Sequence, residues 1–229
     1  MIRSTLAHEF ALSPNIEPRR GSGRVDMLIL HYTGMENAWA ARDWLCNPAS
    51  GVSCHYLIDE QGVITQMVGE DMCAWHAGIS SWEGDSDINS RSIGIEIHNP
   101  GHSLGYQDFP QAQMLAVIVL CRDIIARHNI AARRVLAHSD VAPGRKIDPG
   151  EKFDWERLYR AGVGHWVEPV VASGDADLHE LGRLLSAYGY GVWPAKAAIA
   201  AFQRHFRQTK VDGIADRSTL ETLKRLSAS

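Results

Sequence analysis

The sequence contains no long run of apolar residues. Its richest run, Met114 to Cys121, is only eight residues long and ends at Arg122 and Asp123, whereas a membrane-spanning helix needs about 18 or more. The N-terminus lacks a basic region followed by an unbroken apolar segment, because His8 and Glu9 interrupt it. We therefore expect no integral membrane segment and a cytoplasmic location; the alternative is the periplasm, if a native signal is missing from this sequence.

Cysteine and net charge are also scarce. The four cysteines show no CxxC spacing, so we expect reduced thiols in a cytosolic protein. Lysine and arginine number 23 against 27 aspartate and glutamate, a net charge of -4, which gives no indication of a nucleic-acid partner. With 45% hydrophobic residues in 229, the chain is typical of a globular protein, here expected to be a monomer.

Apolar patterns in residues 1–165 alternate between strand and helix periods. The run Val25–Tyr32 is typical of a strand buried on both faces, and residues 52–58 and 63–68 flank a turn at Asp59–Gly62, which predicts a hairpin. Further strands are predicted at 92–98 and 135–137, with helices at 36–45 and 111–128. The pattern predicts an α/β domain with a mixed central β-sheet flanked by helices.

The amino-acid composition changes after this domain. Glycine, proline and serine accumulate in residues 166–175, which predicts a linker. Residues 176–229 then show leucine and phenylalanine at helical spacing in three short segments, so we expect a small C-terminal three-helix domain. Such a unit could also serve stability or dimerisation alone.

Two histidines and one aspartate are candidates for a metal site. His31 ends a predicted core strand, His138 follows the strand at 135–137, and Asp148 lies in the loop beyond. Two imidazoles and one carboxylate form a common catalytic zinc set with a fourth position left for water. The sequence contains 11 histidines, so spacing alone leaves open that these are ordinary packed or exposed side chains.

Two further charged residues lie near these candidates in the sequence. Lys146 stands two residues before Asp148, so in an extended segment both side chains project to the same side; Lys146 could contact a substrate oxygen or be an ordinary surface charge. Glu96 lies on a predicted strand whose isoleucines face the other way. A carboxylate there is either paired structurally or a general base with a raised pKa.

Five ordered segments carry a family resemblance. They are Leu28–Thr33 (LILHYT), Val52–Leu57 (VSCHYL), Ala74–Ile79 (AWHAGI), Ser92–Ile97 (SIGIEI) and Ala137–Pro149 (AHSDVAPGRKIDP). The chain resembles the zinc-dependent N-acetylmuramoyl-L-alanine amidases, in particular the AmiD- and AmpD-like branch, over about residues 24–165. This family also includes the T7 phage lysozyme and the animal peptidoglycan recognition proteins.

The resemblance implies a role for each candidate. It makes His31, His138 and Asp148 the ligands of one zinc ion, Glu96 the residue that activates water, and Lys146 the group that stabilises the oxyanion. It also implies that His76 contacts the substrate. The scissile bond would be the amide between N-acetylmuramic acid, or its anhydro form, and L-alanine of the stem peptide, in muropeptides recycled from the cell wall.

Some assignments stay open at this stage. His55 matches the family but is favoured as a structural histidine, and Trp82 could line the substrate groove. The segments Tyr188–Tyr190, Ala200–Phe206 and Val211–Ile214 resemble a peptidoglycan-binding domain. The alternatives to amidase activity are a non-catalytic muropeptide sensor and a zinc peptidase.

Overall fold

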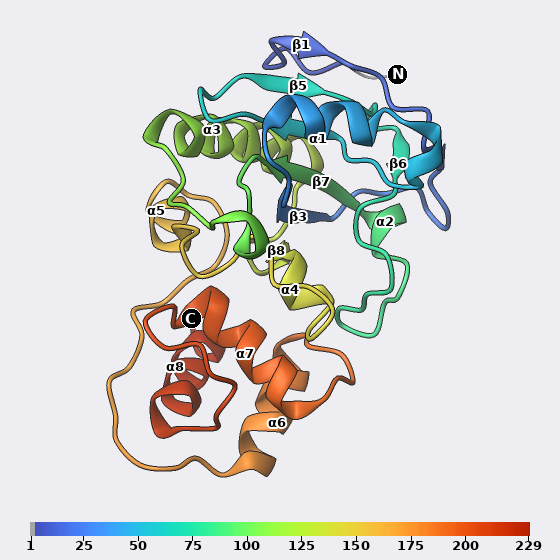
Figure 1. Cartoon of the computed structure of the whole chain (residues 1–229). Helices are drawn as coiled ribbons and strands as arrows, with labels where there is room; N and C mark the ends of the chain where they lie inside the picture. Colours follow the sequence, from blue (N-terminus) through green and yellow to red (C-terminus); the bar gives the residue numbers. More distant parts are fainter. Residues whose placement is uncertain (1–2) are drawn as a thin grey trace.

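The computed structural model describes residues 3–229, and its centre is a six-stranded sheet (Figure 1). The strand order is β1-β5-β4-β7-β3-β8. The hairpin partners β4 and β5 are antiparallel and the other neighbouring pairs are parallel, which confirms the predicted mixed α/β sheet. Its strands are β1 (Glu9–Phe10), β3 (Met27–Tyr32), β4 (Tyr56–Ile58), β5 (Ile64–Gln66), β7 (Ser92–Ile97) and β8 (Val135–Ala137).

Some elements of the structure are too short to be predicted from a sequence pattern. A second sheet pairs β2 (Ile16–Pro18) with β6 (Met72–Ala74), and neither strand was predicted. The helix predicted at 111–128 and the strand at 135–137 have the expected bounds. The helices are α1 (Ala38–Leu45), α2 (Ile88–Arg91), α3 (Gln111–His128), α4 (His138–Val141), α5 (Trp155–Arg160), α6 (Leu178–Tyr188), α7 (Ala195–Phe206) and α8 (Arg217–Ser227), with 3-10 turns at Pro48–Ser50, His102–Leu104 and Ala132–Arg134.

Alternation along β3 divides the core into two parts. Leu28 and Leu30 pack in one cluster with Val117 and Cys121 of the amphipathic α3, because successive strand side chains point to opposite faces. Met27 and Ile29 belong to a different cluster, shared with the C-terminal helices α6, α7 and α8. Figure 1 shows these three helices grouped together, with α7 next to α4. Within residues 3–229, no helix is long and apolar enough to cross a membrane.

The second face of the sheet is covered at two separate places. On the β4 side, Leu57 packs with Ala41 and Leu45 of α1. On the β3 side, Met27 and Ile29 belong to the buried cluster that extends through α4 to the C-terminal helices. Between these two places, the same face of the sheet carries the alternate side chains of β3 and β7. Polar side chains on this part of the face can therefore border a cleft and need not lie in an apolar core.

Candidate metal centre

Three neighbouring parallel strands end at the same edge of the sheet. His31 of β3 is paired with Glu96 of β7, and Leu30 is paired with Ala137 of β8, so His138, the next residue, lies beside His31. The carboxyl ends of parallel strands are where such sheets bind ligands. Asp148 reaches this edge from the loop after α4, because its backbone carbonyl accepts a hydrogen bond from the Ser139 amide at 3.0 Å.

The donor atoms of three buried side chains converge here. Nδ1 of His31 lies 2.9 Å from Nδ1 of His138, and Oδ2 of Asp148 lies 3.2 Å and 3.0 Å from these two nitrogens. Across residues 3–229, this is the only group of three or more His, Cys, Asp or Glu donors close enough to share one metal ion. Two nitrogens and one carboxylate oxygen facing one point match the donor set of a catalytic zinc site, so these residues fit zinc.

The His138 ring is held by a backbone carbonyl. Its Nε2 lies 3.1 Å from the carbonyl oxygen of Ala77, and because a carbonyl oxygen only accepts, Nε2 carries the hydrogen. The guanidinium of Arg145 also donates to this carbonyl and to that of Ile79. Nδ1 of His138 therefore keeps its lone pair for a metal.

A chain of hydrogen bonds fixes the His31 ring in the same way. Its Nε2 lies 3.0 Å from Nδ1 of His76, and Nε2 of His76 lies 3.1 Å from Oγ of Ser92. The Ser92 hydroxyl donates to the carbonyl of Ile88 at 2.7 Å, so it accepts from His76. His76 in turn accepts from His31, which leaves Nδ1 of His31 unprotonated and facing the metal position.

The charges at the centre agree with this arrangement. Burial, followed by the proximity of His138, lowers the pKa of His31 to about 4. Burial alone would raise the pKa of Asp148, but His138 and His31 hold it well below the ordinary carboxyl value. A neutral His31 and an ionised Asp148 are the protonation states that a divalent metal requires.

Glu96 has a carboxyl oxygen without a partner. Its Oε2 is buried and makes no hydrogen bond with the described part of the chain. Burial, followed by the negative charge of Asp148, raises the pKa of Glu96 well above the ordinary value, and the positive charge of Lys146 opposes this rise. A carboxyl group with a free oxygen and a raised pKa is suited to proton transfer.

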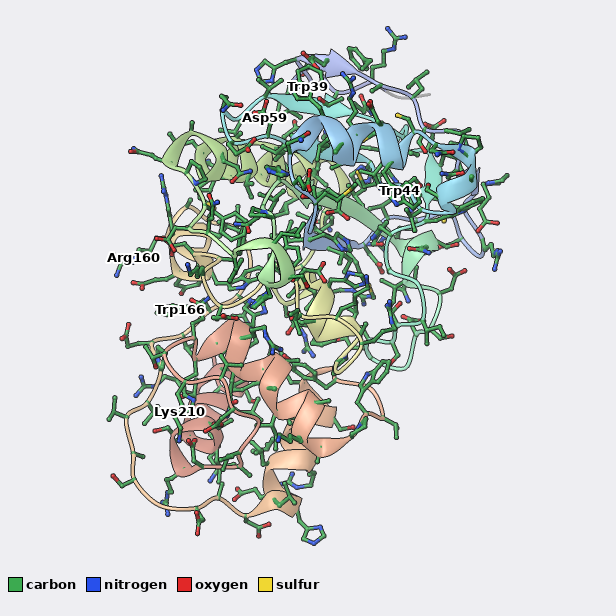
Figure 2. The ribbon with its side chains drawn as sticks, in the orientation of Figure 1. Trp39, Trp44, Asp59, Arg160, Trp166 and Lys210 are labelled. Atoms are coloured by element: carbon green, nitrogen blue, oxygen red, sulfur yellow. The ribbon has the colours of Figure 1, made fainter. Side chains whose placement is uncertain are left out.

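A cleft of about 460 Å³ opens above these groups, which is within the usual size range of small-molecule sites. Its lining includes apolar side chains, among them Trp44 of α1, and the cationic side chains of Lys146 and Arg145. Figure 2 shows Trp44 on the side of α1 nearer β7 and Trp39 on the other side. Trp39 does not line the cleft and is 62% exposed.

The structure brings the predicted site residues together. Its cleft is lined by His76, Glu96, His138, Lys146 and Asp148, and His31 completes the donor triangle. His76 lines the cleft, but both of its ring nitrogens are hydrogen-bonded within the protein, one of them to the His31 nitrogen that faces away from the metal position. Substrate contact by His76 stays a prediction.

Two neighbouring residues have structural positions. His55 is fully buried, and its Nδ1 accepts the Gly94 amide at 3.0 Å, which confirms the structural interpretation. The suggestion that Trp82 lines the groove is wrong: it is fully buried and packs against Tyr190. No local sequence signal marked that contact, because its partner lies more than 100 residues away.

The sequence matches known families in two places. Residues 21–151 match the family model described as N-acetylmuramoyl-L-alanine amidase, and residues 174–223 match a putative peptidoglycan binding domain. The chain is 39% identical to the N-acetylmuramoyl-L-alanine amidase AmiD of Escherichia coli over 86% of this chain and 80% of that protein. It is 31% identical to the 1,6-anhydro-N-acetylmuramyl-L-alanine amidase AmpD of Haemophilus influenzae over 63% of this chain and 86% of that one.

Two solved structures are similar over almost the whole chain. One is E. coli AmiD in complex with the substrate anhydro-N-acetylmuramic acid-L-Ala-D-gamma-Glu-L-Lys, with a TM-score of 0.82, 35% identity and coverage of 93% of this chain and 92% of that chain. The other is AmpDH3 of Pseudomonas aeruginosa with anhydromuramic pentapeptide, with a TM-score of 0.81, 31% identity and coverage of 90% and 92%.

Proposed function

Since the chain belongs to the N-acetylmuramoyl-L-alanine amidase family and is an enzyme of that family, we propose that it uses zinc to release the stem peptide from muropeptides. The bond cleaved is the amide between N-acetylmuramic acid, or its anhydro form, and L-alanine. The observation that carries this proposal is the buried His31, His138 and Asp148 triangle, which faces the same cleft as Glu96.

Each residue of the cleft has a role in this proposal. Zinc held by His31, His138 and Asp148 would lower the pKa of water and polarise the scissile carbonyl. Glu96, with its free oxygen, accepts a proton from the attacking water and returns it to the leaving nitrogen. The Lys146 ammonium stabilises the negative charge that develops on the carbonyl oxygen.

The role of His76 differs from the substrate contact that the family resemblance implies. Its hydrogen bonds to His31 and Ser92 leave neither ring nitrogen for a ligand. We therefore propose that His76 fixes the orientation and tautomer of His31, as hydrogen-bonding partners of metal ligands commonly do.

The proposed reaction is tested by mass spectrometry of the products. The zinc-loaded protein is incubated with a disaccharide-peptide muropeptide and an anhydromuramyl peptide in competition, with and without a chelator. We expect free peptide beginning with L-alanine, its loss with chelator and its return with zinc; the ratio of the two products gives the preference between the substrates. Binding without cleavage would identify a sensor instead, and cleavage inside the peptide would identify a peptidase.

Replacing Lys146 by alanine should lower kcat by about 10²- to 10³-fold, the usual cost of losing one oxyanion-stabilising group. Zinc affinity should not change, because Lys146 is outside the donor triangle. The matched control is Lys152→Ala, a lysine further along the same loop that pairs with Asp108. Steady-state kinetics of both variants check this, and equal rates for Lys146→Ala and Lys152→Ala would refute the role.

For the rest of the chain we propose the division predicted from sequence. Residues 1–165 form the catalytic domain, 166–175 a linker and 176–229 a peptidoglycan-binding-like domain, supported by the two separate family matches. A cytoplasmic location in cell-wall recycling and a monomeric state stay predictions; cell fractionation and light scattering test them, and periplasmic or dimeric protein would overturn them.

A further inference from the structure

The helix that carries His138 is too short to hold itself in place. Helix α4 has four residues, and a single turn is unstable by itself because its few hydrogen bonds do not offset the cost of nucleation. Two of the three donors nevertheless depend on it. His138 begins it, and its Ser139 amide donates to the backbone carbonyl of Asp148. Whatever fixes α4 therefore also fixes the metal centre.

Asp140, in the middle of α4, is the residue through which this helix is held. It is fully buried, and its carboxyl group has three donors. The Ala137 amide donates to Oδ2 at 2.8 Å, Nδ1 of His205 lies 2.6 Å from the same oxygen, and the Tyr190 hydroxyl donates to Oδ1 at 2.7 Å. Only the first of these donors belongs to the catalytic domain; the other two come from residues 176–229.

Both C-terminal donors are held rigidly. The His205 ring is stacked on Trp155, with ring centroids 3.7 Å apart, and on Phe206, at 3.9 Å. The Tyr190 ring packs edge-on against Trp82. Burial, followed by the charge of Asp140, raises the pKa of Tyr190 well above its usual value, so its hydroxyl keeps the proton that it donates.

The surrounding packing joins α4 to the C-terminal helices. Val141 of α4 and Leu136 of β8 belong to the same buried cluster as Phe202 and Phe206 of α7. Figure 1 shows α7 directly beside α4. The C-terminal unit is therefore docked against the helix that carries His138, and a buried carboxyl group there relies on its donors.

We infer that Asp140, His205 and Tyr190 form an interdomain clasp, and that through it the C-terminal domain positions two ligands of the metal centre. These three are positioning residues, since none of them touches the metal position or lines the cleft. The inference rests on the proposed zinc site. It assigns the C-terminal domain a part in metal binding, in addition to any contact with peptidoglycan.

Two buried tyrosines of the same domain provide a matched test. Tyr190→Phe removes one donor to Asp140, whereas Tyr188→Phe removes a hydroxyl that is bonded to His165. Zinc affinity of the full-length variants is measured by competition with a chromophoric chelator. We expect Tyr190→Phe to bind zinc measurably more weakly, by less than the roughly 10- to 100-fold typical for residues hydrogen-bonded directly to a metal ligand, because Tyr190 acts through Asp140; Tyr188→Phe should bind zinc like the unmodified protein.

His205→Phe is the second variant, because it removes the other donor and keeps an aromatic ring between Trp155 and Phe206; it should weaken zinc binding similarly. Unchanged zinc affinity in the two clasp variants, or an equal loss in Tyr188→Phe, would overturn the clasp. Failure of the unmodified protein to bind zinc would instead overturn the proposed function. Thermal unfolding of the zinc-free proteins, measured in parallel, should show that both tyrosine variants remain folded at the temperature of the zinc titration.

Discussion

Replacing Glu96 by glutamine is expected to lower kcat by about 10³-fold, within the usual range for loss of a general base, and to leave zinc binding unchanged. Glutamine has nearly the same shape but cannot accept the proton of the attacking water. Glu96 is not one of the three convergent donors, so the metal site should stay intact. The measurement is single-turnover cleavage of a muropeptide, with zinc content determined on the same sample.

The matched control for this variant is Glu60→Gln. Glu60 lies outside the cleft and pairs with His98 at 3.1 Å, so the same chemical change there should leave kcat as it was. Normal turnover by Glu96→Gln would show that the base is another group. Loss of zinc from Glu96→Gln would show that this carboxylate supports the metal, contrary to its position here.

The convergence of His31 and His138 could be predicted because the sequence signals for it are local. His31 and His138 each occur where an apolar strand ends, and such strand ends meet at one edge of a parallel sheet. The long helix at 111–128 could be predicted from one apolar stripe over five turns. The orientation of Glu96 could be predicted from its alternation with isoleucines, since burial of those isoleucines on one face of the strand places the carboxylate on the other face.

The support of the site could not be predicted, because it depends on contacts between distant segments. Asp140 gave no signal of its own, since its donors Tyr190 and His205 lie 50 and 65 residues away. The position of His76 beside His31 depends on how the loop after β6 returns to the sheet. The four-residue α4 is stabilised by tertiary contacts, so its local sequence alone does not predict a helix.

Replacing His138 by alanine should remove tight zinc binding and activity together. The change deletes one corner of the donor triangle and leaves two donors. Without zinc, the reaction loses several kcal/mol of stabilisation, a decrease in rate of at least about 10³-fold. Equilibrium dialysis against zinc and product analysis by mass spectrometry on one preparation provide the measurement. Activity retained by His138→Ala in the absence of zinc would refute the metal mechanism.

A comparison of His76→Leu with His138→Ala distinguishes a residue that orients a metal ligand from a metal ligand itself. His76→Leu keeps the donor triangle but removes the acceptor of the His31 Nε2 hydrogen and the hydrogen bond to Ser92, so zinc affinity should fall by about 10- to 100-fold without being abolished. Excess zinc should then restore much of the activity of His76→Leu. It should not restore the activity of His138→Ala, because a higher zinc concentration does not replace the missing ligand. If instead His76→Leu bound zinc normally and bound substrate poorly, His76 would be a substrate contact, and the hydrogen-bonded chain from His31 to Ser92 would have no part in metal binding.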